Sequence, residues 1–368
     1  MTQKSVILAG GGTGGHVLPI VAVAQALVAQ GVPEEAIQFI ASARGPDRTL
    51  LDPLPFSADY VSGRGIQRSM KPRAIRDNIG AVLGLLKAVV STVVHIAKWK
   101  PKVIVSAGGY AAFPAVFSAR LLRIPLVLVN IDAVPGAVHR LFGKGAAASC
   151  VGFRGTDLPN ATVTGAPLSV AITSAVRSEE AKARARRHFG LQDGTVVGVV
   201  GGSLGARSIN RATMDLVASG LGGVEVYHVA GRRDFDVLEA ERIAIGAPEG
   251  YHLVPFETAM ADLYVAADVI VARAGAMTVA ELAAVGVPAI LVPLPGAPGD
   301  HQTKNAQALV DAGGAVLVND RELSGEKLAQ IIGDLTPARL FEMAAASSTL
   351  HTPDAAAMIA SVVVRYVA

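Results

Sequence analysis

The sequence is poor in three kinds of feature, and each shortage excludes a class of protein. It has one cysteine, Cys150, which rules out an intramolecular disulfide and fits a reducing compartment. Aromatic residues make up 5%, too few to predict stacking platforms for nucleic-acid bases. The best candidate for a membrane span, 80–97, is interrupted by Lys87 and His95, so we expect a helix with a broad apolar face instead. Four apolar residues precede the first glycines, too few for a signal peptide.

Length and charge add two expectations. At 368 residues the chain exceeds the usual size of a single core, which predicts two domains. The net charge is only +3, but residues 60–102 carry nine basic side chains and one acidic one, Asp77, so this segment is +8 and the remainder −5. Such a segment predicts an anionic partner, and an ordinary solvated face is the alternative. The basic residues are Arg64, Arg68, Lys71, Arg73, Arg76, Lys87, Lys98, Lys100 and Lys102.

A glycine-rich turn near the N-terminus carries the first functional signal. Residues 6–9 read as a buried strand, 10–15 contain five glycines and Thr13, and an apolar-periodic helix follows over 16–29. Glycine backbone can approach a ligand closely, and the helix N-terminus favours an anion. His16 lies in the first helical turn, where an imidazole is placed for proton transfer and where the helix end should lower its pKa. A plain connecting turn with His16 as a polar cap is the alternative.

The rest of the chain alternates short apolar strands with helices, which predicts an α/β protein with parallel, doubly wound sheets. Ligands of such sheets bind beyond the carboxyl ends of the strands. The pattern restarts near residue 165, and a second glycine turn at 201–206 echoes the first. The expected strands are 36–41, 103–106, 126–129, 195–200, 224–229, 269–271 and 289–293, with helices over 80–98, 112–122 and in the region after 323, and a loop over 43–60.

Two clusters in the second half are suited to a nucleotide sugar. Glu281 lies about one and a half turns into the helix that follows 273–278, where a carboxylate can accept hydrogen bonds from a ribose diol. Residues 300–305 open another helix with side chains of the kind that a sugar needs. Asp234 and Asp236 form a D-x-D pattern, but aspartate at a helix start is more often an N-cap, so we expect no metal site. A surface role is the alternative for Glu281.

Six motifs together resemble the MurG family of bacterial glycosyltransferases, in the same order and over nearly the whole chain. They are G-G-G-T-G-G-H at 10–16, S-A-G-G-Y at 106–110, A-V-P-G at 133–136, G-G-S-x-G-A at 201–206, R-A-G-A-M-T-V-A-E-L at 273–282 and D-H-Q-x-x-N-A at 300–306. The resemblance implies a GT-B fold: two Rossmann-like doubly wound domains with an interdomain cleft. It implies an acceptor- and membrane-associating domain over 1–164, a UDP-GlcNAc-binding domain over 165–352, and a C-terminal helix, 353–368, packed back on the first domain.

The resemblance also implies an activity: inverting transfer of GlcNAc from UDP-GlcNAc to the MurNAc 4-hydroxyl of lipid I, giving lipid II for peptidoglycan, with no cofactor. His16 is the first candidate for the base and Asp132 the second. Carried over by position, the donor-binding residues are Gly202, Ser203, Phe256, Arg273, Gly275, Ala276, Met277, Thr278, Glu281, His301, Gln302 and Asn305. The acceptor-binding residues are Gly12, Thr13, Gly14, Gly15, Gly109, Tyr110 and Asn130.

A member of this family is expected in the cytoplasm, peripheral on the inner face of the bacterial cell membrane. Its expected partners are UDP-GlcNAc, lipid I, the anionic membrane surface and other cell-wall synthesis proteins, but not nucleic acid. The sequence departs from the family at 129–132, where V-N-I-D replaces H-E-Q-N, at Ala166 and at Leu204.

Three other functions stay open from the sequence. The spacing of Gly10, Gly12 and Gly15 also fits an NADP-dependent oxidoreductase. The other two are a GT-B enzyme acting on a different glycolipid or natural product, and a nucleotide-sugar-binding protein that has lost catalysis.

Overall fold

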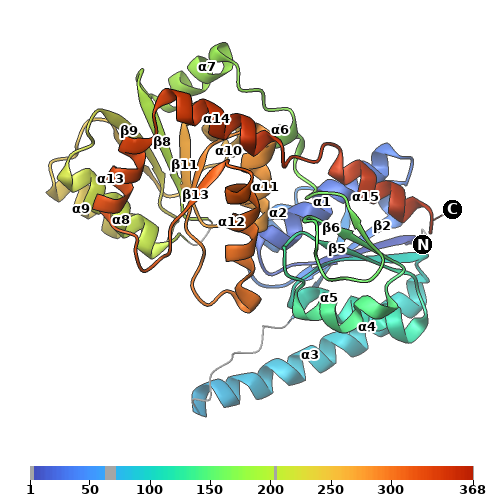
Figure 1. Cartoon of the computed structure of the whole chain (residues 1–368). Helices are drawn as coiled ribbons and strands as arrows, with labels where there is room; N and C mark the ends of the chain where they lie inside the picture. Colours follow the sequence, from blue (N-terminus) through green and yellow to red (C-terminus); the bar gives the residue numbers. More distant parts are fainter. Residues whose placement is uncertain (1–3, 63–71, 203–204, 368) are drawn as a thin grey trace. The chain divides into compact units, whose positions relative to one another are not determined.

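The computed structural model describes residues 4–62, 72–202 and 205–367, with the backbone alone over 72–83. The chain divides into two compact units (Figure 1). Unit 1 comprises Met1–Ser169 and Asp354–Ala368, and unit 2 comprises Val170–Pro353. Each unit is built on its own parallel sheet, so the α/β architecture expected from the alternating pattern is confirmed.

Unit 1 has a seven-stranded sheet in the order β3-β2-β1-β4-β5-β6-β7. The four strands in the middle of this order, β2, β1, β4 and β5, are buried along their whole length, because sheets covered on both faces need near-continuous apolar strands. The strands are β1 (Val6–Gly10), β2 (Ile37–Ser42), β3 (Ser57–Val61), β4 (Val103–Gly108), β5 (Leu126–Asn130), β6 (Ala148–Val151) and β7 (Ala161–Val163).

The helices of unit 1 include the last helix of the chain. Gln30, at the end of α1, donates a hydrogen bond to the Ala357 carbonyl oxygen of α15 at 2.9 Å, so the C-terminus is fastened to the first helix. Helix α3 packs along α4 (Figure 1). The helices are α1 (Gly14–Ala29), α2 (Asp47–Leu51), α3 (Pro72–Trp99), α4 (Phe113–Leu122), α5 (Ala137–Phe142) and α15 (Ala355–Val364), with short 3₁₀ turns at Glu34–Ala36, Tyr110–Ala112 and Gly143–Gly145.

Unit 2 has a six-stranded sheet in the order β10-β9-β8-β11-β12-β13. Its strands are β8 (Thr195–Val200), β9 (Val224–Val229), β10 (Tyr251–Val254), β11 (Val269–Ala272), β12 (Ala289–Leu291) and β13 (Ala315–Leu317). Its helices are α6 (Val170–Thr173), α7 (Glu179–Phe189), α8 (Arg207–Ser219), α9 (Phe235–Ala244), α10 (Met260–Ala266), α11 (Ala276–Val285), α12 (His301–Asp311), α13 (Gly325–Asp334) and α14 (Pro337–Ser348), with a 3₁₀ turn at Pro298–Asp300.

The strand order places the glycine turns at the two positions where such sheets bind ligands. In unit 1 the order reverses between β1 and β4, which lead into the turns at 10–15 and 108–109. In unit 2 it reverses between β8 and β11, which lead into 201–206 and 273–275. A crevice opens beyond the carboxyl ends of the strands at such a reversal. Each unit therefore has one candidate ligand site at the centre of its sheet.

Candidate active site

The first glycine turn is held from below by a buried carboxylate. The Gly12 N–H donates to both carboxylate oxygens of Asp47 at 3.0 Å, and the Ser42 N–H donates to Oδ2 at 2.7 Å. Burial raises the pKa of Asp47, and these backbone bonds oppose the rise. A Cβ on Gly11 would lie 2.1 Å from Asp47 Oδ2, so only glycine fits there. Asp47 had no signal in the sequence, because its partners lie in the turn after β1 and at the end of β2.

His16 stands in the first turn of α1, half-buried, with its ring oriented by a neighbour. Its Nδ1 lies 2.9 Å from Thr13 Oγ1. When this bond runs from Nδ1–H to the hydroxyl, Nε2 is the basic nitrogen of the ring. The ring also lies against the second turn of unit 1, since a Cβ on Gly109 would be 3.5 Å from its Cγ. Thr13 and Gly109, both predicted to bind acceptor, therefore set the position of His16.

Tyr110 lies against the first glycine turn, on the same side of unit 1 as Gly109. Its hydroxyl is hydrogen-bonded to Ser42 Oγ, and its Cε1 would lie 2.6 Å from a Cβ on Gly12. The fold thus brings together the predicted residues of two separate turns, with Gly14 and Gly15 in the first turn of α1, where no earlier carbonyl can accept their N–H groups. A helix start with such N–H groups can bind an anion such as a phosphate.

The end of β5 carries the second candidate base, Asp132, and the predicted acceptor residue Asn130. Asp132 is partly exposed, whereas Asn130 is 4% exposed. The Asn130 amide donates to the Asp132 carbonyl oxygen at 2.7 Å, and its Oδ1 lies 3.0 Å from His139 Nδ1. Asn130 is therefore used within unit 1 to shape the turn that carries Asp132.

In unit 2, most of the predicted donor residues lie in the turn after β11, in α11 and at the start of α12, which follow the carboxyl ends of β11 and β12. Gly275 is the N-cap of α11, Ala276 is buried, and Met277 and Thr278 are partly exposed in the first turn. The Asn305 side chain, fully buried in α12, donates to the Ala274 carbonyl oxygen at 3.2 Å and so fastens this turn.

The Arg273 guanidinium is engaged within unit 2. It donates to Asp320 Oδ1 at 2.6 Å, to Ser208 Oγ at 2.7 Å and to the carbonyl oxygens of Val292 and Pro293 at 3.1 and 3.2 Å. These partners come from α8, from the end of β12 and from the segment after β13. Arg273 therefore ties its own loop to three other segments of unit 2, around the loops predicted to bind the donor.

Glu281 is half-buried in α11 and accepts a hydrogen bond from the Tyr264 hydroxyl at 2.9 Å. Burial raises the pKa of Glu281 to about 7, and the bond from Tyr264 lowers it in part. The carboxyl group therefore titrates near neutral pH. Its capacity to accept hydrogen bonds from both hydroxyls of a diol changes in the same range.

The remaining predicted donor residues lie on loops and at a helix start. Gly202 has φ +76° and is exposed, and Ser203 lies outside the described residues. Phe256 is 44% exposed, with the Arg232 guanidinium 4.9 Å from its ring centre. His301 Nδ1 donates to the Pro298 carbonyl oxygen at 2.9 Å, and Gln302 Oε1 accepts from the Leu294 N–H at 2.9 Å.

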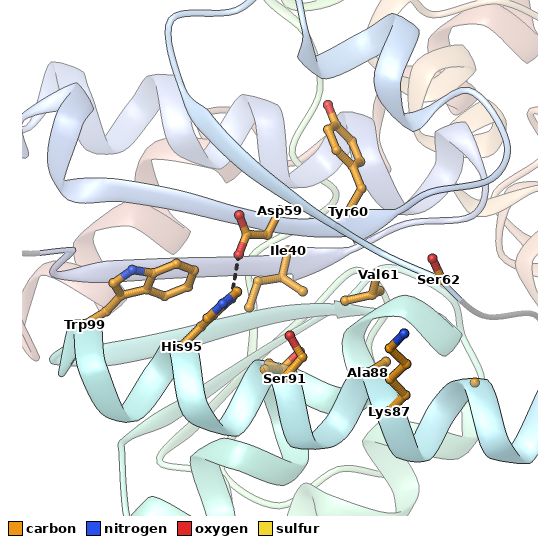
Figure 2. Close-up of a pocket in the computed structure, with 12 residues that line it drawn as sticks. Ile40, Asp59, Tyr60, Val61, Ser62, Lys87, Ala88, Ser91, His95 and Trp99 are labelled. Atoms are coloured by element: carbon orange, nitrogen blue, oxygen red, sulfur yellow. Dashed lines mark hydrogen bonds and ion pairs between the residues drawn. The ribbon is translucent and has the colours of Figure 1, made fainter.

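A cavity of about 350 Å³ lies between β3 and α3 of unit 1 (Figure 2). His95 Nδ1 and Asp59 Oδ2, both from residues that line the cavity, are 3.0 Å apart. The ring centroids of His95 and Trp99 are 5.3 Å apart. None of the predicted site residues lines it, so it is separate from the candidate active site.

Within 4–62, 72–202 and 205–367, no group of three or more His, Cys, Asp and Glu residues is placed to hold a metal ion. In the same part of the chain, no helix has the length and apolar character of a membrane span.

Comparison with known proteins decides the family. The N-terminal domain model of glycosyltransferase family 28 matches residues 6–150, and the C-terminal domain model matches 196–359. A protein of Burkholderia orbicola named UDP-N-acetylglucosamine–N-acetylmuramyl-(pentapeptide) pyrophosphoryl-undecaprenol N-acetylglucosamine transferase is 37% identical over 98% of this chain and 96% of its own. A protein of the same name from an Exiguobacterium species is 33% identical over 97% and 98%. A crystal structure of Acinetobacter baumannii MurG covers 99% of this chain and 100% of its own, with a TM-score of 0.75 and 28% identity.

The chain belongs to the MurG family. The family expected from the six motifs is thus confirmed, as is the GT-B class with two parallel-sheet domains. MurG membership also removes the oxidoreductase alternative, which rested on the glycine spacing of unit 1 alone.

Proposed function

We propose that this chain is a UDP-GlcNAc-dependent glycosyltransferase that adds GlcNAc to the MurNAc 4-hydroxyl of lipid I and so forms lipid II. The observation that carries the proposal is the name shared by relatives that match the chain over almost its whole length. The geometry of each unit agrees with the proposal. Unit 2 contains side chains suited to binding a nucleotide and a sugar, and unit 1 contains the His16 imidazole beside the N–H groups of a helix N-terminus.

The reaction is a single displacement with inversion. The 4-hydroxyl oxygen of the acceptor attacks the anomeric carbon of GlcNAc, and the bond from that carbon to the UDP oxygen breaks with its electron pair. The hydroxyl proton passes to His16 Nε2, while Thr13 keeps Nδ1 engaged at 2.9 Å. The charge that develops on the diphosphate is stabilised by the N–H groups at the start of α8.

In unit 2, Glu281 accepts hydrogen bonds from the ribose hydroxyls, and Phe256 lies beside the uracil. Residues 276–278, His301, Gln302 and Asn305 surround the sugar, with Asn305 acting through the backbone of Ala274. In unit 1, the group formed by Gly12, Thr13, Gly109 and Tyr110 receives the polar head of the acceptor.

Turnover tests the proposal directly. Release of UDP from UDP-GlcNAc should require a lipid I analogue, and mass spectrometry should show one added GlcNAc on the muramyl sugar. A reaction without acceptor is the control. UDP release with another glycolipid but not with lipid I would instead assign a different GT-B activity, and UDP-GlcNAc binding without turnover would leave a binding protein.

The outer face of α3 is proposed to lie on the membrane that holds the acceptor. Leu86, Val90 and Val94 repeat every four residues and are 56%, 64% and 58% exposed, while the opposite stripe of Ala88 and Ile96 is buried. An apolar stripe beside Lys87 and Lys98 fits the surface of an anionic bilayer. Arg64, Arg68 and Lys71 of the predicted basic segment lie outside the described residues, as do the side chains of Arg73, Arg76, Ile75, Ile79, Val82 and Leu83.

Replacing Leu86, Val90 and Val94 together by asparagine should weaken binding to anionic vesicles by about tenfold or more. Burying one such side chain contributes about 1.5–3 kcal/mol, and about 1.4 kcal/mol corresponds to tenfold. Added salt should weaken the binding of the unchanged protein, because it screens the lysines. Flotation with and without phosphatidylglycerol measures both effects, with Val237→Asn, also an exposed apolar residue, as the matched control. Equal flotation of the triple variant and the control would remove α3 from the membrane face.

A further inference from the structure

His139 is a buried histidine that the proposed chemistry does not use. It lies in α5 and is 2% exposed. Burial and the nearby His16 lower the pKa of His139 to about 4, so the ring is neutral at physiological pH. A neutral imidazole has one donor and one acceptor nitrogen, and its neighbours decide which is which.

The hydrogen bonds around His139 run in one direction. Asn130 donates through Nδ2 to the Asp132 carbonyl oxygen, so its Oδ1 is the acceptor that faces His139 Nδ1 at 3.0 Å. Nδ1 therefore carries the proton, and Nε2 accepts from the Ser106 hydroxyl at 3.1 Å. The Ser106 oxygen in turn accepts from the Gly108 N–H at 3.2 Å.

This chain of bonds joins the turn against which His16 lies to the turn that carries Asp132. At one end, Gly108 has φ +84°, and a Cβ there would lie 3.4 Å from His139 Cε1 and 3.8 Å from His16 Cδ2. The two imidazoles therefore border the same glycine. At the other end, Asn130 fixes the carbonyl of Asp132. A shift of the His139 ring would move the surface against which His16 lies and would release the turn after β5.

We propose that His139 is a positioning residue for the transfer reaction: as the Nδ1–H tautomer it fixes the Gly108–Gly109 turn beneath His16 and the Asn130–Asp132 turn in one arrangement. This inference rests on the proposed function. His139 does not touch substrate. Its effect falls on the acceptor side of the reaction and leaves the donor site in unit 2 unchanged.

Two variants separate positioning from simple stability. His139→Phe keeps a ring of similar size and removes both bonds, and Ser106→Ala removes only the hydroxyl. Each should lower kcat with a lipid I analogue, by up to about 10²-fold for His139→Phe, because small misplacements of a reacting group cost that much. The KM for UDP-GlcNAc and its binding measured by calorimetry should change less than about twofold. The double variant should be no slower than His139→Phe, since both changes break one chain.

Ser118→Ala is the matched control, because Ser118 is also a buried serine of unit 1 whose hydroxyl bonds to the Pro114 carbonyl oxygen at 2.7 Å. It should lower the melting temperature without changing kcat. If Ser106→Ala behaves in the same way, His139 is merely structural and the proposal is wrong.

A readout independent of activity uses nitrogen-15 NMR of the histidine rings. The His139 signals should show the Nδ1–H tautomer and should not titrate between pH 5.5 and 8.5, and the His16 signals should move in Ser106→Ala. Titration of His139 in this range, an Nε2–H tautomer, or unmoved His16 signals would overturn the inference. Because this measurement needs no substrate, it distinguishes failure of the inference from failure of the proposed transferase activity.

Discussion

Replacing His16 by alanine should lower kcat by about 10²–10⁴-fold, the range that general base catalysis contributes. UDP-GlcNAc binding should stay within about twofold of the unchanged protein, because the proposed donor residues lie in unit 2. The acidic limb of the pH–rate profile, which reports protonation of the base, should disappear. Steady-state kinetics with saturating lipid I analogue, from pH 5.5 to 9, measures all three quantities.

Asp132 is the competing assignment, and the same experiment separates the two. If His16→Ala retains the acidic limb and Asp132→Asn abolishes it, Asp132 is the base and His16 orients the acceptor. Thr13→Val gives a graded comparison, because it removes only the bond to His16 Nδ1 and should cost less than loss of the ring. Near-normal kcat in both His16→Ala and Asp132→Asn would show that neither residue is the base.

Replacing Glu281 by alanine should weaken UDP-GlcNAc binding by about 1–3 kcal/mol, as expected for the loss of hydrogen bonds to a charged acceptor. In the unchanged protein, affinity should rise with pH. The pKa of Glu281 in the unliganded protein is about 7, and the carboxylate accepts ribose hydroxyls better than the neutral acid does. From pH 6 to 8 the ionised fraction rises about tenfold for a group of this pKa, and affinity should follow it.

Calorimetry with UDP-GlcNAc is the appropriate measurement, because its diphosphate is esterified at both ends and does not titrate in this range. Glu281→Gln should abolish the pH dependence. Tyr264→Phe should move its midpoint upward, because the Tyr264 bond lowers the pKa of Glu281. The sign for folding is opposite to that for binding: a raised carboxyl pKa stabilises the fold at low pH, and this contribution is lost as pH rises through about 7. Affinity that does not vary with pH in a protein with intact Glu281 would contradict the ribose role.

The sequence predicted best what is encoded locally. Continuous apolar runs placed β8 and β9 at their observed bounds, and glycines marked where the central strands of both sheets end. That these turns bind ligands stays a prediction. The predicted loop over 43–60 was wrong, because it contains α2 and β3. β3 is an edge strand with polar Ser57 and Asp59, so it lacks the continuous apolar run by which the other strands were predicted. Helix α2 begins at Asp47, whose hydrogen bonds are to Gly12 and Ser42.

Side-chain partners were harder to predict, because they depend on tertiary contacts. Asp354 stands at the N-cap position of the last helix, where its residue type predicts a capping bond, but its side chain makes none. Asp234 likewise precedes α9, yet its carboxylate is bound by the Arg233 guanidinium at 2.7 Å. His139 had no sequence signal, since its ring matters only through Ser106 and Asn130, which lie on other elements.

The carboxylate of Asp47 has a consequence for how unit 1 meets its substrate. Because it already binds the Gly12 N–H, the first glycine turn has its shape before any ligand arrives. Binding therefore need not order this segment, and little conformational entropy is lost there when the acceptor docks. The same bonds withhold the Gly12 N–H from an incoming phosphate. Gly12 can therefore shape the proposed acceptor site, but the backbone donors left for a phosphate are the N–H groups in the first turn of α1. The Asp47 carboxylate thus holds the turn preorganised by occupying, from within the protein, a backbone donor that a bound anion would otherwise use.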